Sequence, residues 1–432
     1  MSDITTTRIF VDGEKGITAA KLNDIIASSS IQPAFYTGKP TASTADPSDT
    51  MLILKAGAYT QVPVSTLADS ISTSEIWSAR LRSFNAIGNP TFEVDQRNVG
   101  GGVAVTTTAW GVDRWGVQLS GTGRAAAQQL AENVAVPGTN YFITSKIFRT
   151  YVTTAEASLA AGDYLVINSN IEGPQLRELL GDVHSVSLLV RSSVANLKFG
   201  MTLQDSVGAY SLTKLCTLGS ADTWTLITLA NLPLWTASGT FPVNSGGIGY
   251  TFNIVLACGT TYTVASNDIW QSTAGFGAVG QDNFLATNGS YFDIAFVQHE
   301  PGPVCSTLMD KPFSQNYDEC LRYYFKTYSY AVALGSVTYA GANGGFYSSV
   351  AGAANGHGVY AKRMAKIPTI TLYSPASGTK NAVTRGSDAV NVAASPVVSM
   401  VGDSAFMQIS SSAAAIPLGS NILSHYSADT GW

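Results

Sequence analysis

The side chains best suited to chemistry in this sequence are aromatic rings of the kind that bind sugars. Aromatic faces stack on sugar rings, while Asn, Gln and Asp side chains bond to sugar hydroxyls. Trp235 and Trp270 are flanked by turn and polar residues, so we predict that these two contact a glycan at the surface. Trp224 opens an apolar run and is expected in the core instead. A core role is also the alternative for most of the other aromatic residues.

Catalytic patterns are absent from the sequence. The four histidines, His184, His299, His357 and His425, are far apart and show no triad or metal-ligand spacing. Two carboxylates placed across a sugar can cleave a glycosidic bond, but no such pair stands out among 29 acidic residues. The sequence therefore predicts no catalytic residue, no metal site and no cofactor, and a protein that is not an enzyme.

Two other motifs carry little chemistry. Residues 275–280 match GxGxxG by letter, but no βαβ pattern surrounds them, so a loop is expected. The four cysteines lack CxxC spacing and are expected to be reduced, buried thiols. The aromatic residues are therefore the main candidates for binding, because the histidines, carboxylates and cysteines show no functional pattern.

Composition points to an uncharged, turn-rich β protein. The 432 residues are 45% hydrophobic and only 12% charged, about half of the ~25% charged residues of ordinary soluble domains. A net charge of −5, with 24 Lys and Arg spread through the chain, excludes a basic footprint for nucleic acid. The first residues lack the apolar segment of a signal peptide, and no apolar run reaches the ~18 residues of a membrane span. We expect synthesis in a cytoplasm, without membrane insertion.

Residues 1–84 are expected to form a small, separate N-terminal α/β piece. A hairpin is predicted around Ala56 and Gly57, with short helices starting near Thr18 and Ser65. This piece is too small to be stable alone, so we expect it to dock or self-associate.

Residues 85–305 hold most of the strand patterns, including residues 141–148, 186–190 and 291–297. Many strands without interleaved long helices predict an antiparallel two-sheet sandwich. Two segments have helical patterns, residues 124–133 and 175–180, and the second is the stronger prediction. Residues 306–432 are expected to form a third, β-rich unit, in which residues 317–324 form a short helix that runs into a strand.

Several stretches together resemble the tail-fibre and receptor-binding proteins of tailed bacteriophages. Residues 89–98 and 112–115 resemble the opening of the jelly-roll body in that family, and residues 291–302 resemble its exit. Residues 424–429 are similar to the terminal strand of fibre tips, and residues 51–71 to small N-terminal anchors. Further landmarks of the same body are residues 161–164, 171–173, 176–177, 223–224 and 320–324.

The resemblance implies a homotrimeric virion fibre with a jelly-roll body similar to carbohydrate-binding modules. Residues 1–84 would attach the fibre to another virion protein, and a host cell-surface polysaccharide would be the ligand. The family motif implies structural roles for Asp95, Arg97, Asp113 and Arg114. At the position of His299 the family often has Leu, so this strand is expected to carry a local polar contact here.

The resemblance leaves three functions open. The first is a tail fibre or spike that adheres to the host. The second is a fibre of the same build that decorates the capsid or collar, because both kinds of fibre use the same parts. The third is a polysaccharide depolymerase, and the lack of a 20–50-residue repeat counts against a β-helix enzyme.

Overall fold

The computed structural model describes residues 50–55, 58–63, 84–180, 183–233, 235, 238–244, 246–411 and 416–432. The chain divides into two units, Met1–Ile76 and Trp77–Trp432. In the first unit, strands β1 (Thr50–Lys55) and β2 (Ala58–Pro63) pair antiparallel, which confirms the predicted hairpin. The helices predicted near Thr18 and Ser65 lie outside the described residues. No helix in the described part of the chain is long and apolar enough to cross a membrane.

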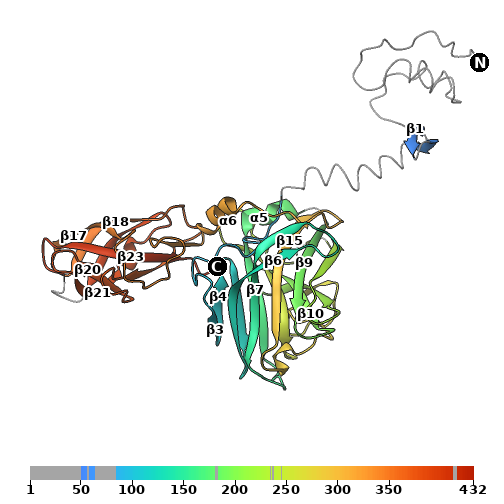
Figure 1. The fold of residues 1–432 in the computed structure, drawn as a ribbon, viewed down its shortest axis with the longest axis horizontal. Helices are drawn as coiled ribbons and strands as arrows, with labels where there is room; N and C mark the ends of the chain where they lie inside the picture. The colour runs from blue at the N-terminus through green and yellow to red at the C-terminus, as the bar shows by residue number, and fades with distance from the viewer. Residues whose placement is uncertain are drawn as a thin grey trace, which may run out of the picture. The chain divides into compact units, whose positions relative to one another are not determined.

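The second unit begins with a sandwich of two antiparallel sheets, which confirms the predicted mainly β fold (Figure 1). The seven-stranded sheet consists, in spatial order, of β14 (Trp270–Ser272), β11 (Tyr210–Thr217), β10 (Lys198–Asp205), β13 (Ile248–Cys258), β8 (Tyr164–Glu172), β5 (Trp115–Ser120) and β4 (Thr108–Val112). The six-stranded sheet consists of β12 (Thr225–Leu232), β9 (His184–Ser192), β15 (Tyr291–Pro301), β7 (Phe142–Thr154), β6 (Arg124–Ala135) and β3 (Val103–Val105). The chain crosses repeatedly from one sheet to the other, as in a jelly roll.

The main core lies between these two sheets. Alternate residues of β9 point inward, with Val186, Leu188 and Val190 fully buried. Trp115 is also fully buried, and its ring contacts that of Phe92 at a centroid distance of 5.0 Å. Period-two alternation is what lets each strand bury one face and present the other.

The helical pattern of residues 124–133 was misleading, because this segment forms strand β6. Alanine favours helices when no tertiary partner is present. Here β6 pairs with both β3 and β7, and Ala125 and Ala127 pack inward against the core. Tertiary pairing therefore overrides local propensity. The other predicted helix is confirmed as helix α5 (Gly173–Leu176) and the 3-10 turn η2 (Arg177–Leu179).

The rest of the second unit starts with helix α6 (Phe313–Cys320) and continues as an antiparallel sheet. The sheet strands are β16 (Tyr324–Lys326), β17 (Asn343–Val350), β18 (Ala353–Val359), β19 (Thr369–Tyr373), β20 (Ala382–Arg385), β21 (Val390–Pro396), β22 (Ala405–Ser411) and β23 (Asn421–Asp429). Short 3-10 turns η3 (Phe284–Ala286) and η4 (Val398–Met400) complete the elements. This sheet has its own core around Phe346, Phe406 and Ile422.

The structure also tests the predictions for the cysteines and for Asp95. The cysteines are free thiols as expected, although Cys258 and Cys305 are only half-buried. The Asp95 carboxylate accepts hydrogen bonds from the backbone N–H groups of Asn98 (2.9 Å) and Gly100 (2.6 Å), which gives it the structural role that the family motif implies.

Candidate functional site

A row of three charged side chains and one aromatic ring crosses the outward face of the six-stranded sheet. We call it the charged ladder: Trp224, Arg191, Asp293 and Arg149. Strand register places Asp293 of β15 between Arg191 of β9 and Arg149 of β7. Arg149 Nε lies 2.7 Å from Asp293 Oδ1, and the Arg191 guanidinium lies 2.6 Å from Asp293 Oδ2. The Asp293 carboxylate is fully buried between the two cations, so it is fixed in place.

Glu132 of β6 joins the ladder on the same face of the sheet. Its carboxylate accepts two hydrogen bonds from Arg191, at 2.9 and 2.8 Å, and one from the indole N–H of Trp224, at 3.1 Å. Burial alone would raise the pKa of Glu132, but the bonds from Arg191 and Trp224 outweigh it and lower that pKa. Strands β6 and β9 are separated by two strands, so the Glu132–Arg191 contact spans the face of the sheet.

Two aromatic rings are held against the arginines of the ladder by cation–π contacts. The Arg191 guanidinium lies 4.5 Å from the centre of the Trp224 ring, and that of Arg149 lies 3.9 Å from the Tyr291 ring. The Tyr291 hydroxyl donates a hydrogen bond to Asp222. Both rings are half-buried, so part of each is accessible to a ligand.

The neighbouring rows of the same face are apolar and covered. Leu189 lies opposite Phe296, and Leu130 lies opposite Ile147. These side chains form a small second core with Leu308, from the segment that follows β15. Because Leu308 and its neighbours cover the apolar half of the sheet face, the charged ladder is its more accessible half.

The two predicted glycan contacts, Trp235 and Trp270, lie together at another place in the sandwich. Their ring centres are 4.9 Å apart. Trp235 stacks on His184 at 5.1 Å, and Trp270 stacks on Tyr210 at 5.4 Å with an interplanar angle of 4°. Both rings are half-buried and pack against the main core, so much of their surface is already occupied. Their contact with a glycan stays a prediction.

The residues that the sequence analysis missed are those of the ladder. Trp224, expected in the core, is half-buried and packs against the small second core on the outward face. The available signal was the position of Arg149, Arg191 and Asp293 inside apolar strands, in a chain with few charges. A charge in the middle of a strand is costly unless it is paired, so such residues predict an ion-pair network.

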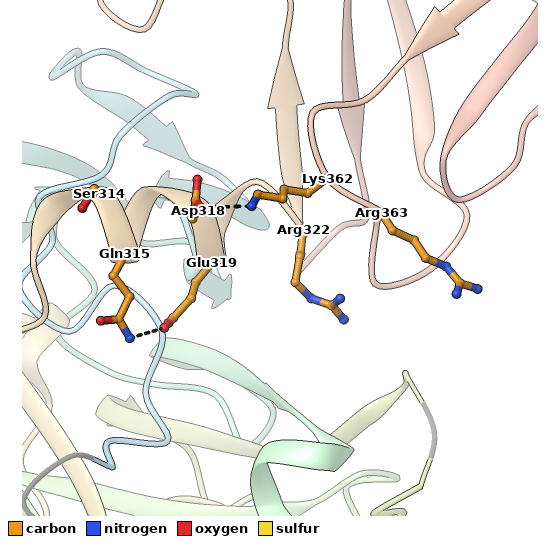
Figure 2. A pocket seen from close by; sticks show the side chains of 7 residues that line it. All are labelled: Ser314, Gln315, Asp318, Glu319, Arg322, Lys362 and Arg363. Carbon is orange, nitrogen blue, oxygen red and sulfur yellow. Dashed lines mark hydrogen bonds and ion pairs between the residues drawn. The ribbon is translucent and has the colours of Figure 1, made fainter.

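A different hollow, of about 650 Å³, lies beside helix α6 (Figure 2). Its cations are already paired: Lys362 with Asp318 at 3.0 Å, Arg322 with Glu172 at 2.7 Å, and Arg363 with Asp403 at 2.7 Å. Paired charges leave this groove little affinity for a charged ligand. Among the described residues, no group of three His, Cys, Asp or Glu side chains is placed to hold a metal ion.

Comparison with known proteins gives structural neighbours only. No family model and no curated protein matches the chain. A carbohydrate-binding module, TmCBM61, in complex with β-1,4-galactotriose is 13% identical over 51% of this chain and 99% of its own, with a TM-score of 0.25. The family 11 carbohydrate-binding module of Clostridium thermocellum, in complex with a β-1,3-1,4-mixed-linked tetrasaccharide, is 10% identical over 46% and 97%, with a TM-score of 0.26.

A phage protein is also among these neighbours. The enzymatically active domain of tailspike protein 4 from bacteriophage CBA120 is 10% identical over 50% of this chain and 21% of its own, with a TM-score of 0.24. The structural neighbours thus include carbohydrate-binding modules and a tailspike domain. With every one of these TM-scores below 0.5, the likenesses do not decide what this chain binds.

Proposed function

We propose that this chain is a trimeric fibre or spike of a tailed-bacteriophage virion that adheres to a host cell-surface glycan. The observation that carries the binding proposal is the charged ladder, where two fixed aromatic rings flank a neutral set of polar groups. Arg149 and Arg191 balance Asp293 and Glu132, so the ladder offers hydrogen bonds without net charge. Such a surface suits an uncharged saccharide, whose rings stack on aromatic faces.

The same geometry supports binding rather than cleavage. A glycosidase needs one carboxylic acid whose pKa is raised so that it can protonate the leaving group. Glu132 has a lowered pKa, because the hydrogen bonds from Arg191 and Trp224 outweigh its burial. Asp293 is bound by two guanidinium groups. We therefore propose a non-enzymatic adhesin, and release of reducing sugar from a bound polysaccharide would contradict it.

Binding is tested on an array of bacterial surface polysaccharides probed with the full chain. We expect Trp224→Ala to weaken the signal about tenfold, equivalent to ~1.4 kcal/mol. Tyr339→Ala is the matched control, because Tyr339 is an exposed aromatic residue outside the sandwich strands. Equal binding by the wild type and Trp224→Ala would exclude the ladder as the site.

The trimer and the virion location rest on the sequence resemblance. Three weak sugar sites on one stalk raise avidity without any single tight site. We expect light scattering to give three times the 45.3 kDa of one chain. A monomeric mass would contradict the fibre proposal.

Gold-labelled antibody on intact virions distinguishes the two placements. Label at the tail supports a receptor-binding fibre, and label on the capsid or collar supports the decorating alternative. Deletion of residues 1–84 should abolish incorporation into particles while the rest of the chain still folds.

A further inference from the structure

A second hollow, of about 530 Å³, is lined by residues from the sandwich and from the C-terminal sheet, and we call it the junction pocket. The sandwich contributes Arg97 and Trp110. Strands β16 and β19 contribute Tyr324, Thr369 and Thr371. Nothing in the charged ladder takes part in it, so the two surfaces can be tested separately.

The floor of the junction pocket is rich in hydroxyl groups because of strand alternation. Ile370 of β19 belongs to the C-terminal core, whereas Thr369 and Thr371 point the other way and line the pocket. Register places Thr369 opposite Asp429, and Thr371 opposite Ser427. Two neighbouring strands therefore present a patch of hydroxyls that can bond to sugar hydroxyls.

The wall is a rigid aromatic stack around Arg97. The Arg97 guanidinium lies 5.1 Å from the Trp110 ring centre and 4.2 Å from that of Tyr324. It forms an ion pair with Asp429 and lies 3.4 Å from Asp113, so both its charge and that of Asp429 are largely satisfied. Trp110 is half-buried and leaves ring surface for a pyranose.

Two groups in the pocket lack partners within the described part of the chain. The Tyr324 hydroxyl is buried and makes no hydrogen bond there. Lys380 is exposed and forms no ion pair with any described residue. Buried polar groups are normally bonded, so an orphan hydroxyl in a pocket points to a ligand.

We propose that the junction pocket binds a uronic acid unit of an acidic polysaccharide. The Trp110 ring stacks on the pyranose, and the Thr369 and Thr371 hydroxyls bond to its hydroxyl groups. Lys380 pairs with the carboxylate. This anionic preference differs from that of the charged ladder, and it does not depend on the ladder binding any sugar.

The test is calorimetric titration of the full chain at pH 7 with trigalacturonate and with a hyaluronan tetrasaccharide. Methyl-esterified trigalacturonate is the matched ligand control, because it keeps the rings and loses the charge. We expect an acidic probe to bind, and the ester to bind about tenfold more weakly. Failure of both acidic probes, or equal binding of the acid and the ester, would overturn the proposal.

Two variants check the residues. Lys380→Gln should weaken binding of the acidic probe about tenfold, while Lys362→Gln, a lysine in the groove of Figure 2, should leave it unchanged. Tyr324→Phe should weaken binding without lowering the unfolding temperature, because the hydroxyl it removes has no hydrogen-bond partner among the described residues. Unchanged binding in both Lys380→Gln and Tyr324→Phe would contradict the proposal that the junction pocket binds the acidic saccharide. Loss of ladder binding in Trp224→Ala would not affect these results.

Discussion

Three buried side chains, Tyr250, His299 and His184, form a hydrogen-bonded chain that ends on a carbonyl. The Pro233 carbonyl can only accept, so His184 Nε2 donates to it at 3.2 Å. His184 Nδ1 then accepts from His299 Nε2 at 2.9 Å, and His299 Nδ1 accepts from the Tyr250 hydroxyl at 2.6 Å. Each imidazole has one nitrogen that donates a hydrogen bond and one that accepts a hydrogen bond. Neither ring can therefore take up a further proton without losing a hydrogen bond. The local polar contact expected at His299 is thus confirmed.

The hydrogen bonds among Tyr250, His299 and His184 make the stability of the protein depend on pH. Burial lowers the pKa of His184 to about 4, and burial with the neighbouring His184 lowers the pKa of His299 well below its usual value. The unfolded chain therefore binds more protons below ~6.5, and stability falls as pH drops from ~6.5. As the pH falls below ~6.5, we expect each histidine to lower the free energy of unfolding by about 1.4 kcal/mol per pH unit.

Denaturant unfolding at pH 7, 6 and 5 measures this slope. The variant Tyr250→Phe/His299→Leu removes the acceptor and its donor together. Its slope should be shallower than that of the wild type by about 1.4 kcal/mol per pH unit. Parallel slopes would show that His299 is not the titrating group.

Trp235 gives a second prediction at the scale of one residue. Its ring contacts His184, Tyr250 and Trp270, and it packs against the main core. We expect Trp235→Ala to lower the free energy of unfolding by about 3 kcal/mol, the low end for Trp truncation because the ring is half-buried. Thermal and denaturant unfolding measure the loss. An unchanged stability would instead support the surface role predicted from the sequence.

At the scale of elements, the ladder exists because strands from distant parts of the chain pair in one register. Arg191, Asp293 and Arg149 belong to β9, β15 and β7, and a one-residue slip would turn each side chain to the other face. The Asp293 carboxylate therefore holds two strands to the third. Register and ion pairs stabilise each other.

Replacing Asp293 tests this account. Asp293→Ala leaves two partly buried guanidinium groups without their shared carboxylate, and we expect a loss of about 3 kcal/mol. Asp222→Asn is the control, since Asp222 is exposed and its side chain bonds Tyr291 beside the ladder, and Asn tolerates the positive φ of this position. Denaturant unfolding compares the two. A loss in Asp293→Ala no larger than in the control would mean that the ladder does not stabilise the sheet.

At the scale of the whole second unit, the C-terminal strand β23 has an unusual number of partners. It pairs with β16, β17, β19 and β20, and Asp429 at its end forms the ion pair with Arg97. Strand β23 is thus central to the C-terminal sheet. This sheet cannot complete its strand pairing until β23 is in place.

A chain truncated after Ser420 tests the dependence on β23. We expect the C-terminal sheet to become sensitive to protease, because four strands lose backbone hydrogen bonds, while the sandwich core stays protected. Limited proteolysis with mass spectrometry identifies the cut sites. Cleavage within the sandwich at the same rate would show that the two cores unfold together.

The sequence by itself determined the secondary structure where the local pattern was strong. Period-two alternation of β-branched and aromatic residues placed strands such as β9, β15 and β19, and turn residues at 56–57 placed the first hairpin. The small fraction of charged residues indicated a mainly β fold with a polar, uncharged surface. These features are local or compositional, so they can be read without knowing which strands meet.

Only the tertiary structure determined which side chains meet on the outward face of the six-stranded sheet. The Ala-rich segment at 124–133 became strand β6 because β3 and β7 supplied partners that an isolated helix lacks. Arg191, Asp293 and Arg149 lie on three strands, and spacing along the chain does not specify their register. The side-chain period of a strand is two, so the face of each residue is local information, but its neighbour across the sheet is not.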